Sequence, residues 1–215
     1  MAVATASIPP PVLAVDQTWD NGSGDGLWTN PVNWSGNVAP GAADRAVFDP
    51  LVSVTSATIT ANVSVQGVLI MAGYTGTITQ GAGTTLTVGA AAFTQAAGTF
   101  LGGNAAITVN NAFTLSGGSF TSTSGTLTVT GAFTQSGGTF VHNSGTVAFS
   151  TSNVTIDVPT NLTLNNVSFL SGTKTIAAGD TLDILGTLNL AGGVVNGGTL
   201  AAAANIDVQS GFTGN

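Results

Sequence analysis

The sequence contains no cysteine and no glutamate, and Arg45 and Lys174 are its only cationic residues. Charged residues make up 5% of the chain, against about 25% in an average soluble domain. With a formal net charge of -7, the chain has no basic patch to neutralise a phosphate backbone, which excludes nucleic acid as a partner. Its apolar runs are short, and none reaches the roughly 18 residues that a transmembrane helix needs.

The residues that favour surface helices are nearly missing, whereas Thr, Val, Gly and Asn are abundant. Apolar residues alternate with Thr, Ser or Asn in short runs, which is typical of strands that bury one face. Dipeptides such as Gly117-Gly118 and Ser144-Gly145 separate these runs, where a turn needs a positive φ or a small side chain. The sequence therefore predicts an all-β fold.

A repeat of 20 residues indicates which all-β fold this is. Segments 93–112, 113–132 and 133–152 align without a gap, and each contains three short alternating runs. A hairpin meander does not require the same side chain every 20 residues, but a coil that lies directly over the previous one does. We therefore predict a parallel β-helix, or β-solenoid, of about eight coils over residues 51–215. Two internal aromatic ladders are expected in it: Phe93, Phe113 and Phe133, and Phe100, Phe120 and Phe140.

The chain before residue 51 has a different composition. Residues 1–15 are apolar and interrupted by three prolines, so we expect either a disordered tail or the remnant of a signal peptide. Residues 16–50 hold five Asp, the only Arg and all three tryptophans. This segment is predicted to be an N-terminal cap in which Trp19, Trp28 and Trp34 lie over the first coil. Its Asp and Pro residues would halt further strand addition.

The C-terminal residues 205–215 show no comparable block to strand addition. Three explanations stay open. The native protein continues beyond this point, the open coil pairs with another copy of the chain, or residues 205–215 fold over the end. We favour continuation, because the terminal repeats of a repeat protein need caps.

Segment 18–49 resembles the opening of many bacterial surface β-helices, on the strength of Trp19, Asp25-Gly26, Asn33-Trp34 and Pro40-Gly41. The Gly- and Thr-rich coils that follow are similar to autotransporter-associated β-strand repeats and other filamentous-haemagglutinin-like passengers. The resemblance implies a right-handed parallel β-helix that is secreted or displayed on a bacterial cell surface. It implies a role as an adhesin, spacer or matrix scaffold, with host or matrix glycans or proteins as partners. It supplies no catalytic residues.

Because enzymes that cleave pectin also use β-helices, the ionisable residues of the coils are candidates for a catalytic site. A hydrolase needs two or three converging carboxylates, and a lyase needs a cationic base beside metal-binding carboxylates. Asp180 and Asp183 have neighbours about one coil away in Asp157 and Asp207, and Lys174 could pair with Asp180 at the surface. We expect these Asp residues in solvated turn or outward positions. The prediction is that the chain is not an enzyme, and the alternative is a carbohydrate-active β-helix that uses Asp157, Asp180 and Asp183.

No cofactor is predicted, although calcium was considered for the cap. Asn21-x-Ser23-x-Asp25-Gly26 mimics the start of an EF-hand loop, but the twelfth position is Val32, where a bidentate Glu is required. The weak calcium candidates are Asp20, Asp25, Asp44 and Asp49. The competing interpretation is that these side chains cap turns through the backbone, with Asp44 or Asp49 paired to Arg45.

Two kinds of outward row offer further functions. Thr-x-Thr pairs such as Thr126-x-Thr128 suggest an ice-binding solenoid, but the equivalent positions in the flanking repeats include Ala106 and Ala148, which break the row. Carbohydrate binding by rows of Asn and Thr stays open, with Tyr74 as the only tyrosine.

His142 is expected in a turn or an outward position. The sequence as a whole favours a non-enzymatic secreted or cell-surface solenoid.

Overall fold

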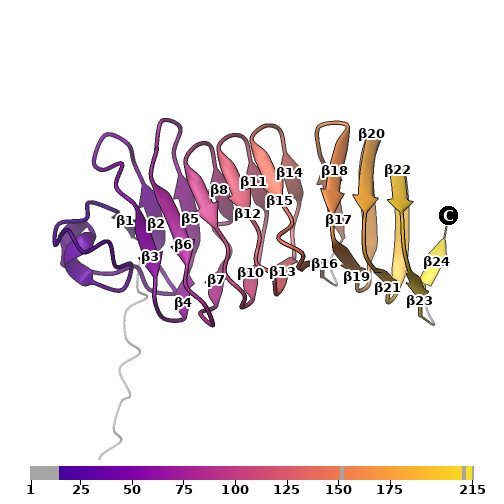
Figure 1. The fold of residues 1–215 in the computed structure, drawn as a ribbon, viewed down its shortest axis with the longest axis horizontal. Coiled ribbons are helices and arrows are strands. Elements are labelled where there is room, and N and C mark those ends of the chain that lie inside the picture. The colour runs from indigo at the N-terminus through magenta and orange to yellow at the C-terminus, as the bar shows by residue number, and fades with distance from the viewer. Residues whose placement is uncertain (1–14, 151–152, 210–211, 215) are drawn as a thin grey trace, which may run out of the picture.

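The computed structural model describes residues 15–150, 153–209 and 212–214, so the tail or signal-peptide remnant predicted for residues 1–15 lies, except for Val15, outside the described residues. The described chain forms one column of parallel strands that runs from β1 at one end to β24 at the other (Figure 1). Each coil pairs with the coils before and after it through parallel ladders. The structure therefore confirms an all-β parallel β-solenoid of about eight turns at about 20 residues per turn.

In the described part of the chain the strands belong to three sheets, named here the long, eight-stranded and five-stranded sheets. The long sheet contains β1 (Asp16–Thr18), β2 (Arg45–Phe48), β5 (Gly67–Ile70), β8 (Phe93–Gln95), β11 (Phe113–Leu115), β14 (Phe133–Gln135), β17 (Val154–Asp157), β18 (Asn161–Leu164), β20 (Thr173–Ile184), β22 (Gly193–Ala202) and β24 (Phe212–Gly214). The eight-stranded sheet contains β4 (Val63–Val65), β7 (Leu86–Val88), β10 (Ile107–Val109), β13 (Thr126–Val129), β16 (Thr146–Phe149), β19 (Asn166–Phe169), β21 (Leu188–Leu190) and β23 (Ile206–Val208). The five-stranded sheet contains β3 (Ala57–Ile59), β6 (Thr77–Gln80), β9 (Thr99–Leu101), β12 (Ser119–Thr121) and β15 (Thr139–Val141).

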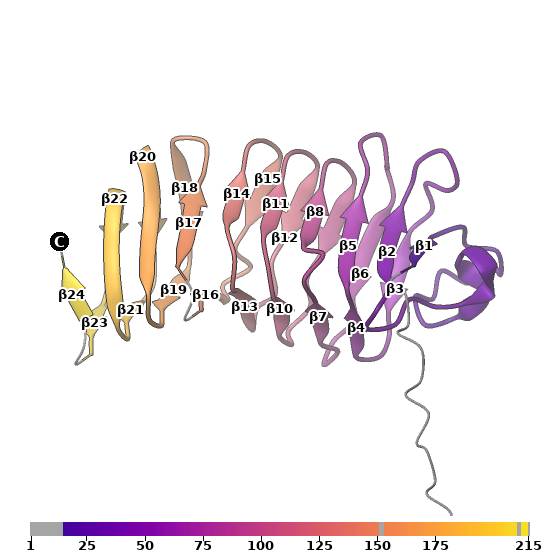
Figure 2. The same ribbon diagram turned by 180° about the vertical axis from the view of Figure 1, so that it is seen from behind.

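One coil passes from the long sheet to the five-stranded sheet, then to the eight-stranded sheet and back. β8, β9 and β10 make one such coil, and β11, β12 and β13 lie beside them in register (Figures 1 and 2). Phe113 pairs with Phe93 on one side and with Phe133 on the other. The 20-residue period of the sequence is therefore the length of one coil.

The aromatic ladders occupy the centre of the column. The ring centroid of Phe113 lies 5.3 Å from that of Phe93 and 5.0 Å from that of Phe133, with the planes 8° and 12° apart. Rings of the second ladder meet those of the first edge-on, as Phe113 does with Phe120 at 4.8 Å and 77°. The stacked rings bury the apolar face of each coil against its neighbours, and this burial stabilises the column.

The three-strand coil changes after β16. The five-stranded sheet ends at β15, and the later coils contain the long strands β20 and β22, which pair along both of their halves. The register between them shifts between Ile176 and Thr181. The simple expectation of three short strands per coil thus describes the earlier coils better than the last ones. In β20 the corner sequence is Ala177-Ala178-Gly179, in place of the Gly-Gly corners of the earlier repeats.

At the N-terminal end, residues 16–50 close the column on two of its sheets. β1 adds the first strand of the long sheet, and the backbone N–H of Trp28 donates to the carbonyl of Thr58 on β3. Two short 3-10 helices, η1 (Pro31–Asn33) and η2 (Ser35–Asn37), complete this segment. No helix in the described part of the chain has the length and apolar character needed to cross a membrane.

The tryptophans of this segment form a buried cluster against Phe48. The Trp34 ring lies 5.1 Å from Trp19, 4.9 Å from Trp28 and 5.7 Å from Phe48. All four side chains belong to the same core cluster as the phenylalanine ladders. The segment predicted as a cap therefore shares one core with the coils that follow it.

The other end of the column leaves apolar side chains uncovered. Ile206 and Val208 on β23 are each 57% exposed, whereas Leu188 and Leu190, their partners on β21, are 2% and 7% exposed. The alternation of the sequence is the same on both strands. The difference arises because β23 is the outermost strand of the eight-stranded sheet in the described chain.

Candidate functional site

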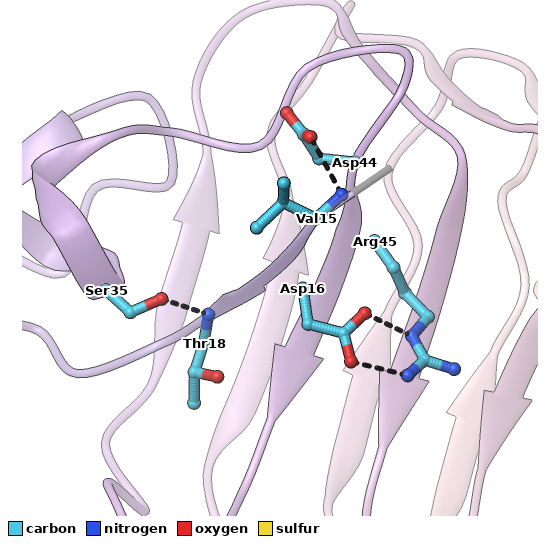
Figure 3. Close-up of polar contacts among 6 residues, drawn as sticks. All are labelled: Val15, Asp16, Thr18, Ser35, Asp44 and Arg45. Atoms are coloured by element: carbon cyan, nitrogen blue, oxygen red, sulfur yellow. Dashed lines mark hydrogen bonds and ion pairs between the residues drawn. The ribbon is translucent and has the colours of Figure 1, made fainter. Parts of the chain in front are cut away.

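An ion pair fastens β1 to the column. Arg45 Nε and Nη2 lie 2.9 and 2.6 Å from the two carboxylate oxygens of Asp16 (Figure 3). The expectation that Asp44 or Asp49 pairs with Arg45 was wrong. Asp16 is 29 residues away from Arg45 in the sequence, and only the parallel pairing of β1 with β2 places the two residues opposite each other.

The outer edge of β1 is partly blocked. The N–H of Trp19 donates to Val47 on β2, so the N–H of Thr18 points away from β2. It donates to Ser35 Oγ at 2.9 Å (Figure 3). Nearby, Asp44 Oδ1 accepts the N–H of Val15 at 3.3 Å. A strand edge whose donor is already occupied is a poorer template for another chain.

The carboxylates considered for calcium bind backbone N–H groups of their own turns. Asp20 accepts from Gly22, Asp44 from Gly41, Asp49 from Leu51 and Asp25 from Leu27. No group of three or more His, Cys, Asp or Glu side chains is arranged to hold a metal ion within the described ranges. The geometry thus matches the interpretation of these residues as turn caps.

Asp25 makes the densest of these networks. Its Oδ1 accepts from the N–H of Leu27 at 2.9 Å and from Asn33 Nδ2 at 2.5 Å, and its Oδ2 accepts from Asn30 Nδ2 at 2.7 Å. These hydrogen bonds, led by the one from Leu27, hold the pKa of Asp25 well below its usual 3.8. The charged carboxylate therefore organises the loop between β1 and η1.

The carboxylates considered for catalysis do not share one environment. Asp157 and Asp207 are exposed, as expected. Asp183 accepts from Asn161 Nδ2 at 3.3 Å. Asp180, expected in a solvated position, is 8% exposed, and its Oδ2 accepts the N–H of Val158 at 2.8 Å. That carboxylate satisfies a buried backbone donor where the long strand β20 bends.

Lys174, the expected surface partner of Asp180, is buried as well. It points to the same side of β20 as Ile176, and its Nζ donates to the carbonyl of Ser171. Loss of solvent around the ammonium group lowers the pKa of Lys174. The alternation Lys174-x-Ile176 was a signal in the sequence that this side chain faces inward.

His142 and Tyr74 have structural partners. His142 Nδ1 accepts the N–H of Ser144 at 2.9 Å, which agrees with the expected turn position. Tyr74 is 1% exposed, its hydroxyl donates to the carbonyl of Thr55, and burial raises its pKa. Tyr74 therefore does not belong to an outward row of sugar-binding residues.

The outer face of the eight-stranded sheet carries polar, mostly uncharged side chains in register. Between the inward residues of successive strands lies one outward row: Thr87, Thr108, Thr128, Ala148, Ser168, Asn189 and Asp207. A second row includes Thr126, Thr146 and Asn166. Ala148 interrupts the threonines at the point where the sequence indicated a break.

A groove of about 330 Å³ opens on this face over β16, β19 and β21. It is lined by Thr146, Asn166, Val167, Ser168, Thr187 and Asn189. Its origin is a drop in side-chain size, because the central outward row shrinks from Thr128 to Ala148 and Ser168 before it widens at Asn189. Ala148 and Ser168 are buried although they alternate with core residues.

The groove is the candidate functional site. The sequence analysis did not predict that its residues form one site. The aligned repeats contain a signal for the groove, because the small residues Ala148 and Ser168 replace threonine at the outward position of two successive coils. Comparison of the chain with family models, with curated proteins and with solved structures finds no match.

Proposed function

We propose that this chain is a non-enzymatic structural segment of a secreted or cell-surface protein. It acts as a stiff spacer or adhesive scaffold, in the manner of the autotransporter-associated β-helices that its sequence resembles. The observation that carries the proposal is the single core, which extends without interruption from Trp19 through the two phenylalanine ladders to Leu190. A column with one shared core transmits load and holds its length as a unit.

The dimensions support a spacer role. About eight turns at a strand spacing of roughly 4.8 Å give a column on the order of 40 Å long. Its outward rows repeat the same polar groups from coil to coil. Repeated identical contacts give avidity to a surface even when each contact is weak, which is what an adhesive scaffold needs.

Partners of two kinds belong to the proposal. Matrix glycans or proteins would contact the outward rows. A second copy of the chain would contact the β23 end, where Ile206 and Val208 are exposed.

Solution scattering and an activity assay together test the proposal. We expect an elongated particle of the stated length, and no release of reducing ends from neutral or acidic polysaccharides. The carbohydrate-active alternative predicts instead a release that Asp157→Asn or Asp183→Asn abolishes. These exposed or half-exposed positions are safer test sites than buried Asp180. Turnover that depends on either carboxylate would overturn the structural role.

A further inference from the structure

Three polar side chains in the groove have hydrogen-bonding capacity that the described residues leave unused. Asn166 Oδ1 accepts the N–H of Thr187 at 2.8 Å, which holds the carboxamide in place and leaves its NH2 group as a donor. Asn189 Oδ1 is shielded from solvent and has no partner among the described residues. Ser168, itself 9% exposed, presents a hydroxyl that can both donate and accept.

Shielded polar atoms of this kind usually have a partner. Rotation of the Asn189 carboxamide toward the groove would let its oxygen accept from a donor bound there. A ligand that complements the groove must accept a hydrogen bond from Asn166 and donate one to Asn189. Toward the Ser168 hydroxyl it can either donate or accept. An alcohol hydroxyl has both capacities. A row of hydroxyls on one molecule therefore matches all three residues at once.

We propose that this groove binds a neutral glycan, laid along the column axis across β16, β19 and β21. The lining residues come from three successive coils, which are spaced by about 4.8 Å. That spacing is comparable with the rise of one sugar residue in an extended glycan chain. Each coil thus offers its polar groups to one sugar.

The charge around the groove selects against acidic sugars. None of the six lining residues carries a formal charge. The next residue of the same row after Asn189 is Asp207, which is exposed. A uronic acid would therefore meet a carboxylate without a compensating cation, on a chain whose net charge is already -7.

The test is a titration of the full chain, followed by calorimetry and by NMR of backbone amides, with four hexasaccharides as probes. Cellohexaose, mannohexaose and chitohexaose are the neutral probes, and hexagalacturonate is the charged comparator. We expect at least one neutral probe to bind, with shifted amide signals on β16, β19 and β21, and hexagalacturonate to bind at least tenfold more weakly.

Two variants and one control locate the site. Ser168→Val fills the groove, and Asn189→Leu removes the shielded amide, so each should weaken binding at least tenfold. Thr108→Val alters the same outward row three coils away from Ser168 and should leave affinity within twofold. Circular dichroism verifies that each variant folds, and if Asn189→Leu does not, Ser168→Val carries the test.

The proposal is overturned if no neutral probe binds at millimolar concentration, if hexagalacturonate binds as tightly as the neutral probes, or if the folded groove variants bind like the unaltered chain. The groove proposal rests on the glycan contact of the proposed function, to which it gives a site, but not on the spacer role. Failure of glycan binding would leave the elongated, non-catalytic column intact, whereas carboxylate-dependent turnover would remove that role whatever the groove binds.

Discussion

A glycine at a coil corner provides the sharpest test of how the coils stack. Gly118 connects β11 to β12 with a φ of 73°, and Gly83 has the same φ in the turn between β6 and β7. A Cβ on Gly118 would lie 2.6 Å from the carbonyl carbon of Ala97 and would also meet the carbonyl oxygen of Gly98, both in the neighbouring coil. A Cβ on Gly83 would meet nothing within 4 Å.

The two alanine substitutions therefore share one cost and differ in another. Alanine with a positive φ costs roughly 1–2 kcal/mol at either site. At Gly118 the new methyl must also displace the backbone of the next coil, and overpacking of this kind adds about 1–3 kcal/mol. We expect Gly83→Ala to lower the free energy of unfolding by about 1–2 kcal/mol and Gly118→Ala by about 2–5 kcal/mol.

Equilibrium urea denaturation, followed by far-ultraviolet circular dichroism, measures both values. The comparison requires similar m-values for the variants and the unaltered chain, because the slope reports the surface exposed on unfolding. Equal losses for the two variants would refute the reasoning, since they would show that the corner at Gly118 has room for a side chain and that adjacent coils are not in backbone contact there.

Further predictions concern the ladder, the loop, the ion pair and the open end. Phe113→Ala should cost about 3–5 kcal/mol in the same assay, and Thr114→Ala, outward on the same strand, less than about 1 kcal/mol; similar values would contradict a buried ladder. Asp25→Asn should destabilise the chain at neutral pH. The contribution of this carboxylate is complete above its usual pKa of 3.8 and disappears as the pH falls through its lower folded value, so the two chains should converge in acid; a constant difference would argue against the charge. Asp16→Asn should cost at most about 1 kcal/mol, because the pair with Arg45 is largely exposed, and a larger loss would indicate a buried pair. Ile206→Asp should shift the chain toward monomer in analytical ultracentrifugation, whereas an unchanged distribution would remove the β23 end as a contact between copies.

Much of the column could be predicted because its information is local and repetitive. Alternation identifies the inward residues, and the 20-residue period pairs Phe93, Phe113 and Phe133. Each coil packs mainly on its neighbours, so similar side chains in successive repeats meet in space. The same logic fails where a repeat departs from its neighbours, as at Ala177-Ala178-Gly179, where the corner opens into the long strand β20.

The candidate site was less accessible to prediction. Thr128, Ala148, Ser168 and Asn189 were each visible in the aligned repeats, but the groove depends on how far neighbouring side chains extend above a shared face. Burial of an ionisable group is similarly hard to foresee. Lys174 was interpreted as a possible surface partner of Asp180, although its position opposite Val154 and Val195 places it inside the column.

Composition and periodicity alone specified that the chain forms strands, that these strands lie in parallel coils and which phenylalanine rings stack, because those properties follow from side-chain spacing along one chain. The tertiary structure decided which distant residues meet across coils. It paired Asp16 with Arg45, placed Asp180 against the N–H of Val158 and left Asn189 Oδ1 without a hydrogen-bond partner among the described residues. Such contacts depend on the exact lengths of the turns between strands, and a repeat pattern does not encode those lengths.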